Sequence, residues 1–247
     1  MALAPLTAHA SGDPSAAVVH FLGSVLIAAA ALLFGYYAVL NIRLNRLESQ
    51  GPFWRYLVAV GATAGCYGLL GVAEIVADSR VLAAFGDGAL LFCIVFLAFS
   101  MREVYYNSAL APPPDDRRFS LESLRRIEAA FVVVILAEWV AVLLIDQTTV
   151  ARIVKGLGSV GFAAYGAVFA EKLESMARGT TLDTLRRHLL PVLVCLGALG
   201  LADLGLAVGV SPVVVQGIKS VFVVLVAGFL VTATIRLQQN VEGLSTA

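Results

Sequence analysis

The stretch CYGLLGVAE at residues 66–74 recurs as CLGALGLAD at residues 195–203, and this repetition guides the reading of the fold. The two copies share a cysteine, two glycines, a leucine and an alanine in register, and each copy ends on a carboxylate. A second match precedes them in the same order, because residues 22–25 and residues 157–160 both read LGSV. Two matches in one order predict a duplicated unit.

The composition predicts a membrane protein. The chain of 247 residues is 60% hydrophobic and only 14% charged, with a mean hydropathy of +0.89. A soluble domain usually carries roughly 25% charged residues. Apolar runs of about 20 residues are long enough to cross a bilayer as helices, which satisfy their own backbone hydrogen bonds in lipid. The sequence therefore predicts an all-α bundle of seven transmembrane helices, at about residues 16–40, 57–77, 81–101, 129–146, 152–171, 189–209 and 212–235.

The positive charges predict an orientation. Lys and Arg accumulate on the cytoplasmic side of membrane proteins. Most of them here fall between the first and second, third and fourth, and fifth and sixth spans, or after the last span. The opposite side holds only Arg80, Arg152 and Lys155. We therefore expect one membrane domain over residues 1–247 in the plasma membrane, with residues 1–15 as an external tail and residues 236–247 as a cytoplasmic tail.

Few residues suggest catalysis or a soluble partner. The sequence has no CxxC, HExxH, P-loop or GxSxG motif, and its three histidines are widely spaced. Cys66, Cys93 and Cys195 all fall in predicted spans, which argues against a disulfide framework. The net charge of zero indicates no nucleic-acid partner. The residues thus predict a protein that is not an enzyme, in contact with the lipid bilayer.

The segment before the fourth span has two readings. Pro112–Pro114 should break the preceding helix, and Ser120 can cap a helix that contains Leu121, Leu124 and Ile127. This helix either lies on the membrane surface and binds a protein partner, or is an N-terminal extension of the fourth span.

Ionisable groups inside the predicted spans are the candidate site, because such groups are costly in a membrane and often mark a pathway or ligand site. We expect Asp203 and Lys219 to form an ion pair across a helical hairpin, with Asp87 beside them. Glu74 and Lys155 should lie nearer the surface. The alternative is a set of structural ties between helices and side chains that reach the membrane surface. The candidate binding residues are Glu74, Asp87, Glu138, Asp203 and Lys219.

The layout resembles two known families. Three helices, a linking helix and three more in parallel repeat form a 3+1+3 plan, which resembles that of SWEET-type sugar transporters. Seven helices with an external N-terminus, an acid on the third helix and a lysine on the seventh also resemble microbial rhodopsins. The second resemblance implies that Lys219 is a retinal Schiff-base lysine and Asp87 its counterion. No other cofactor is predicted.

Three functions remain open from the sequence. The first is transport or conduction of a small solute, proton or cation through the cluster of ionisable residues. The second is a sensory or accessory membrane subunit that signals through a membrane or cytoplasmic protein partner. The third is a retinal protein built on Lys219.

Overall fold

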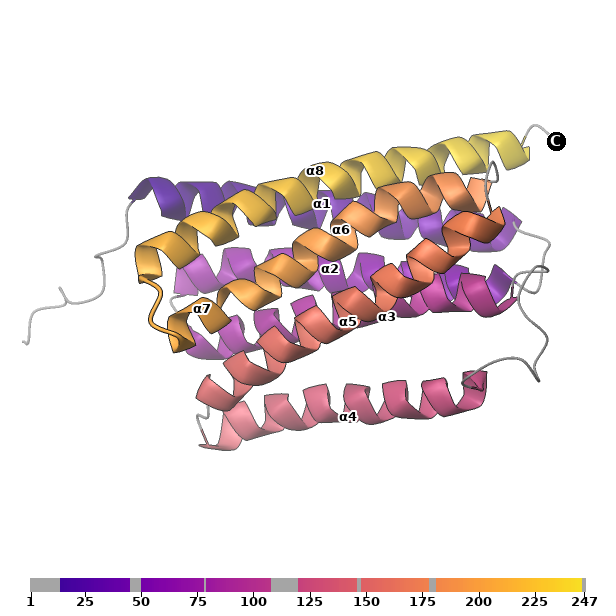
Figure 1. The fold of residues 1–247 in the computed structure, drawn as a ribbon. Coiled ribbons are helices and arrows are strands. Elements are labelled where there is room, and N and C mark those ends of the chain that lie inside the picture. The colour runs from indigo at the N-terminus through magenta and orange to yellow at the C-terminus, as the bar shows by residue number, and fades with distance from the viewer. Residues whose placement is uncertain are drawn as a thin grey trace, which may run out of the picture.

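The computed structural model describes residues 14–44, 50–77, 79–107, 120–145, 148–177 and 181–245. All regular secondary structure in these residues is helical, and the helices lie side by side along one long axis (Figure 1). We call the end of the bundle at which α1 begins the N-end, and the end at which α8 finishes the C-end. The helices are α1 (Pro14–Leu44), α2 (Gly51–Ala77), α3 (Arg80–Asn107), α4 (Leu121–Ile145), α5 (Thr148–Ala177), α6 (Thr181–Ala202), α7 (Leu204–Ala207) and α8 (Pro212–Ser245).

Within the described residues, six helices are long and apolar enough to cross a membrane: α1, α2, α3, α5, α6 with α7, and α8. These agree with six of the predicted spans. The remaining predicted span, residues 129–146, corresponds to α4, whose last turn lies partly outside the described side chains. The chain is therefore an all-helical, multi-pass membrane protein.

Several helices extend beyond the apolar windows that predicted them. At the C-end, α2 begins six residues earlier than expected, at Gly51 rather than 57, and α3 continues to Asn107. Residues 236–245, predicted as a tail, continue α8. Residues 1–13 of the predicted external tail lie outside the described residues. The longer helices bring charged residues at the C-end, which the sequence placed in loops, into the helical bundle.

Two helix boundaries resolve questions left by the sequence. The backbone N–H of Ser123 donates to the Ser120 Oγ at 3.1 Å, and α4 then runs without a break to Ile145. The residues after Ser120 are thus an N-terminal extension of the fourth long helix rather than a separate surface element. The predicted span over 189–209 is present as α6 and α7, between which α6 ends at Ala202 and a turn follows at Asp203.

Six helices form a closed ring, in the order α1, α2, α3, α5, α6, α8 and back to α1. In Figure 1 the helices α1, α2 and α3 lie behind α8, α6 and α5. α4 stands outside this ring and packs mainly on α3, with less contact to α5. At the C-end, α1 and α8 are tied by Asn41, whose Nδ2 donates to the Leu237 carbonyl at 3.1 Å.

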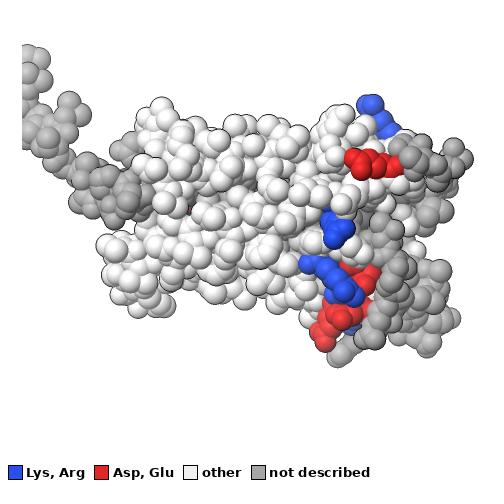
Figure 2. All heavy atoms as spheres, turned by 90° about the horizontal axis from the view of Figure 1, so that it is seen from above, with Lys and Arg blue, Asp and Glu red and all other residues white. Residues whose placement is uncertain are grey.

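The core lies along α3, whose residues 89–101 are almost all buried and apolar. The outer faces of the bundle instead expose many aliphatic side chains, as expected for helices that face lipid rather than water. On the face shown in Figure 2, the charged side chains gather at the C-end and the rest of the surface is uncharged. Cys66, Cys93 and Cys195 are free, as the sequence predicted.

Candidate functional site

A lysine held between two aspartates is the centre of the N-end cluster, which we define as Glu74, Asp87, Glu138, Lys155, Asp203 and Lys219. The Nζ of Lys155 donates to the Asp87 Oδ1 at 2.5 Å and also to the Asp203 Oδ2. Lys155 is only 2% exposed, so its charge is neutralised almost entirely by these two carboxylates. The Lys219 Nζ lies 3.2 Å from the other oxygen of Asp203. Asp203 therefore bridges the two lysines.

The helix boundaries bring these side chains to one depth. Asp87, Lys155 and Lys219 each lie seven residues after the first residue of their helices, α3, α5 and α8. Glu138 lies seven residues before the last residue of α4, whose C-terminus is at the same end of the bundle. At a rise of about 1.5 Å per residue, each lies ~10 Å inside the bundle. Since α3, α5, α6 and α8 are successive members of the ring, Asp87, Lys155, Asp203 and Lys219 come from neighbouring helices.

Asp203 occupies the break between α6 and α7. Its backbone is helical, with φ −70° and ψ −21°, but the following turn is tightened by a hydrogen bond from the Leu206 N–H to the Asp203 carbonyl at 3.3 Å. Such i to i+3 bonds are common where a helix ends. The short α7 then leads into the turn before Pro212, which returns the chain into α8.

The two glutamates of the cluster make no ion pair among the described residues. Glu74 is half-buried and interacts electrostatically with Lys219, Asp87, Lys155 and Asp203. Glu138 is 8% exposed, and its Oε2 has no hydrogen-bond partner in the described part of the chain. The N-end cluster thus holds two lysines and four carboxylic acids, of which only Asp87 and Asp203 are ion-paired.

The expected ion pair between Asp203 and Lys219 is present, but the expected role of Lys155 was wrong. The sequence placed Lys155 near the surface because its apolar run begins at about residue 152. The helix in fact begins at Thr148, one turn earlier, which places Lys155 at the depth of Lys219, where its side chain is 2% exposed against 24% for Lys219. For the same reason Asp87 pairs with Lys155 and not with Lys219.

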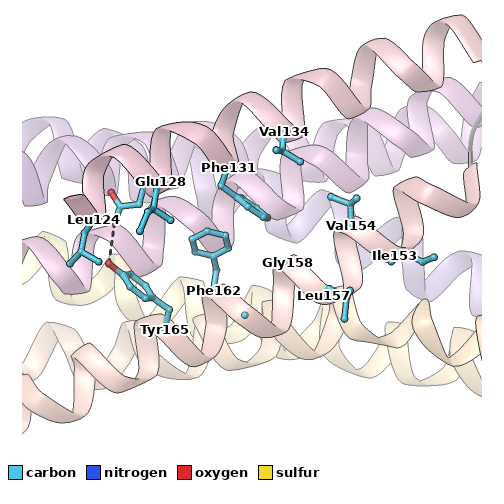
Figure 3. Close-up of a pocket in the computed structure, with 12 residues that line it drawn as sticks. Leu124, Glu128, Phe131, Val134, Ile153, Val154, Leu157, Gly158, Phe162 and Tyr165 are labelled. Atoms are coloured by element: carbon cyan, nitrogen blue, oxygen red, sulfur yellow. Dashed lines mark hydrogen bonds between the residues drawn. The ribbon is translucent and has the colours of Figure 1, made fainter. Parts of the chain in front are cut away.

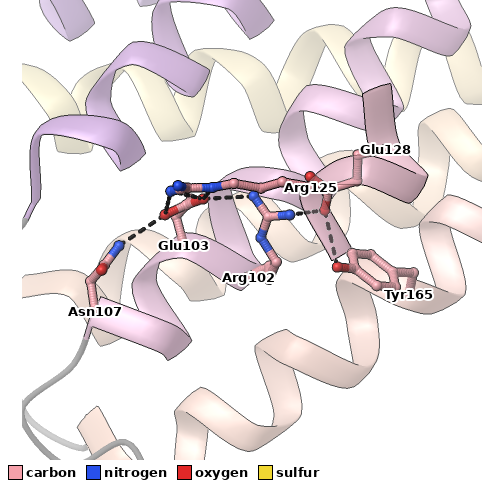
Figure 4. Close-up of polar contacts among 6 residues, drawn as sticks. All are labelled: Arg102, Glu103, Asn107, Arg125, Glu128 and Tyr165. Atoms are coloured by element: carbon pink, nitrogen blue, oxygen red, sulfur yellow. Dashed lines mark hydrogen bonds and ion pairs between the residues drawn. The ribbon is translucent and has the colours of Figure 1, made fainter. Parts of the chain in front are cut away.

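A second charged network, the C-end cluster, lies at the other end of α3 (Figure 4). Arg102 is fully buried and contacts two carboxylates, Glu103 at 2.6 Å and Glu128 of α4. Its guanidinium also lies 5.3 Å from the centre of the Phe99 ring. A fully desolvated cation is thus neutralised by acids from two helices.

Two further side chains complete the C-end cluster on either side of Arg102. Arg125 of α4 forms an ion pair with Glu103 at 2.9 Å, and the Tyr165 hydroxyl of α5 donates to Glu128 at 3.1 Å. The network therefore fastens α4 to α3 and α5 (Figure 4). The sequence reading missed it, since Arg102 and Arg125 were assigned to cytoplasmic segments. The adjacent Arg102-Glu103 pair at the end of an apolar run was the available signal.

Next to the C-end cluster, an apolar groove of about 520 Å³ lies between α4 and α5 (Figure 3). The rings of Phe131 and Phe162 meet across the groove with centres 4.4 Å apart, and Glu128 and Tyr165 close its polar end. Ile153, Leu157 and Val134 on its rim are exposed, so the groove is continuous with the aliphatic surface of the bundle.

No known family model matches this chain, and no curated protein is significantly similar to it in sequence.

Proposed function

We propose that this chain spans the plasma membrane seven times, with the N-end outside and the C-end in the cytoplasm, and that the N-end cluster binds a proton or small cation that the protein carries across the bilayer. The observation that carries this proposal is a fully buried lysine bridging two aspartates, with two unpaired glutamates beside it, inside a lipid-facing bundle. Buried ionisable groups in membrane spans commonly serve ion pathways or proton relays. The gathering of charge at the C-end supports the orientation.

The positions of the two clusters would allow one end of the bundle to open while the other stays closed. Asp87 and Arg102 are fifteen residues apart on α3, or ~22 Å along the helix axis. Apart from Ser100, the side chains between them are apolar, and nearly all are buried, so no charged group bridges the gap on this helix. Each end is thus held by its own ion pairs, and an apolar core separates the clusters. A transporter needs such separately breakable contacts at each side.

The ring of helices supports the duplication and the 3+1+3 plan. If α1, α2 and α3 correspond to α5, α6 and α8, a two-fold axis along the bundle converts each helix contact into another. The α1–α2 contact then corresponds to the α5–α6 contact, and the α2–α3 contact corresponds to the α6–α8 contact. The α1–α8 contact corresponds to the α3–α5 contact. All six contacts are present, and α4 remains outside the ring as the unmatched linking helix.

The repeated sequences also make matching contacts. A Cβ added to Gly68 on α2 would lie 2.9 Å from the Ala28 Cβ on α1, and one added to Gly197 on α6 would lie 2.6 Å from the Ala163 Cβ on α5. Gly68 and Gly197 are equivalent positions of the repeated nonapeptide. Ala28 and Ala163 each follow the LGSV sequence by three residues. Both glycines are therefore required for close helix packing in the same place.

One turn further toward the N-end, the correspondence continues. A Cβ on Gly71 would lie 2.7 Å from the Ser24 Oγ, and a Cβ on Gly200 would clash with the Ser159 Oγ. Both serines are buried and belong to the two LGSV sequences. Three residues after these glycines come the two carboxylates that end the repeats. A duplication would account for carboxylates at equivalent positions of the two repeated sequences, Glu74 and Asp203.

The proposal predicts that protons or Na⁺ change the surroundings of Trp139, whose ring packs on Phe85 at 4.9 Å beside Asp87. In a Trp54→Phe background, Trp139 is the remaining tryptophan. Its fluorescence should change saturably when pH or Na⁺ is varied, and Asp87→Asn or Asp203→Asn should each shift the midpoint of that change, because each variant removes a charge from the cluster.

The matched control for this titration is Arg126→Gln, because Arg126 is 79% exposed and, within the described part of the chain, its one ion pair is with Glu122 at the C-end. This variant should titrate like the parent. A wild-type titration in both asparagine variants would show that the cluster is structural.

The groove between α4 and α5 favours the sensory or accessory function as a second candidate. α4 is fastened at the C-end by ion pairs but contacts α5 little along its length. A helix held in this way could shift when an apolar ligand or partner helix enters the groove. This function becomes the better supported one if Asp87→Asn and Asp203→Asn both leave the Trp139 fluorescence titration unchanged.

The rhodopsin-like alternative is supported less well. The Lys219 ammonium is ion-paired with Asp203 and its side chain is 24% exposed, whereas a Schiff-base lysine must react as a free amine in an enclosed apolar site. The lysine buried in the core is Lys155, and it is already paired twice. Reconstitution with all-trans retinal that produced a visible absorption band would restore this alternative.

A further inference from the structure

Glu138 is fixed in place by the aromatic side chains of its neighbours. The next residue, Trp139, packs against Phe85 at 4.9 Å and Phe92 at 5.4 Å, both on α3. Its indole lies against Gly88, where any Cβ would clash with the ring. This contact sets the rotation of α4 on α3 and keeps Glu138 on the inner side of the helix, where it is 8% exposed.

The charged groups that face Glu138 come from two helices. Asp87 of α3 and Lys155 of α5 act on it electrostatically, the first unfavourably for a carboxylate and the second favourably. The Lys155 ammonium is already shared by Asp87 and Asp203. The Oε2 of Glu138 has no hydrogen-bond partner among the described residues. An ionised carboxylate without a partner is strongly disfavoured in such a site, whereas a neutral carboxylic acid is tolerated.

We propose that Glu138 is the proton-binding group of the N-end cluster, and that it exchanges its proton with the aspartate–lysine pair of Asp87 and Lys155. This inference rests on the proposed function and names the proton as its substrate. In the exchange, the O–H bond of the Glu138 acid breaks and an O–H bond forms on Asp87. The Lys155 ammonium, released from Asp87, then neutralises the new carboxylate on Glu138 while it stays paired with Asp203. Charge is conserved at each step, and no oxidant or reductant is needed.

This exchange gives the linking helix α4 a function that the two repeats lack. Glu138 is the only ionisable residue of α4 between Glu128 and the end of the helix. When Glu138 is protonated, the Lys155 ammonium pairs with Asp87 on α3. When Glu138 is ionised, the ammonium pairs with Glu138 on α4. Proton binding is therefore coupled to the contacts among α3, α4 and α5.

Infrared spectroscopy tests this directly, because a protonated carboxylic acid has a carbonyl stretch distinct from that of a carboxylate. The purified wild type at neutral pH should show this band, and alkaline pH should remove it. Glu138→Gln, which keeps the size of the side chain, should lack the band. Asp87→Asn should keep it and shift the pH at which it disappears, since a neighbouring charge has been removed.

The outcomes separate this inference from the proposed function. A band that persists unchanged in Glu138→Gln would overturn the assignment of the proton to Glu138, even if transport were observed. A band lost in Glu138→Gln, in a protein without transport activity, would leave the proton site in place and remove the transport proposal. If Glu138→Gln fails to fold, Glu138→Asp provides the second variant, and its band should move in frequency; an unmoved band would also overturn the assignment.

Discussion

Replacing Lys155 by methionine is expected to be among the most destabilising single changes in this protein, lowering the free energy of unfolding by about 3–5 kcal/mol. Methionine keeps much of the volume of the side chain but removes the ammonium. Asp87 loses its ion pair with Lys155, and Asp203 keeps, among the residues that the structure describes, only the contact with the more exposed Lys219. The loss arises mainly from carboxylates left buried without a partner. Unfolding in mixed detergent micelles measures it.

Neutralising the carboxylates should reverse most of this loss. The triple variant Lys155→Met, Asp87→Asn, Asp203→Asn removes the uncompensated charge and should be more stable than Lys155→Met alone. Lys219→Met is the matched control, because Asp203 would keep its ion pair with Lys155 and Asp87 would be unaffected, so its effect should be smaller. Equal losses for Lys155→Met and Lys219→Met would contradict the central position of Lys155.

Arg102→Met should produce a loss of similar size at the C-end, about 3–5 kcal/mol, because Glu103 and Glu128 would both lose a buried cation. Adding Glu128→Gln should recover part of the stability, while the Arg125 contact continues to neutralise Glu103. The exposed pair of Arg126 with Glu122 provides the comparison, since surface ion pairs contribute about 0–1 kcal/mol. A loss from Arg102→Met no larger than that from Arg126→Gln would show that Arg102 is solvated in the native protein.

Much of the architecture could be predicted from hydropathy alone. Six apolar runs became six long helices because lipid-exposed backbone must satisfy its hydrogen bonds within each helix. The hairpin geometry was enough to predict the pair of Asp203 with Lys219, since both residues lie at the same distance from one turn. Ser120 was recognisable as a helix cap because it precedes a run of helix-forming residues.

The partners of the other charges could not be predicted in this way. Hydropathy marks the apolar part of a helix and not its ends, so the extra turn at Thr148 that buries Lys155 was invisible. The same limit hid Arg102, which lies just past the apolar run of α3 but is buried because α4 and α5 pack over it. Pairing across helices depends on rotation about each axis. A repeat of small residues restricts that rotation but does not fix it.

Ion flux in proteoliposomes tests the central claim most directly. Vesicles that contain the wild type should dissipate an imposed proton or Na⁺ gradient faster than protein-free vesicles. Asp87→Asn and Asp203→Asn should each reduce the rate to the protein-free level, and Arg126→Gln should match the wild type. If the wild type is active and both asparagine variants carry the same flux, the N-end cluster is a structural element and not the transport site.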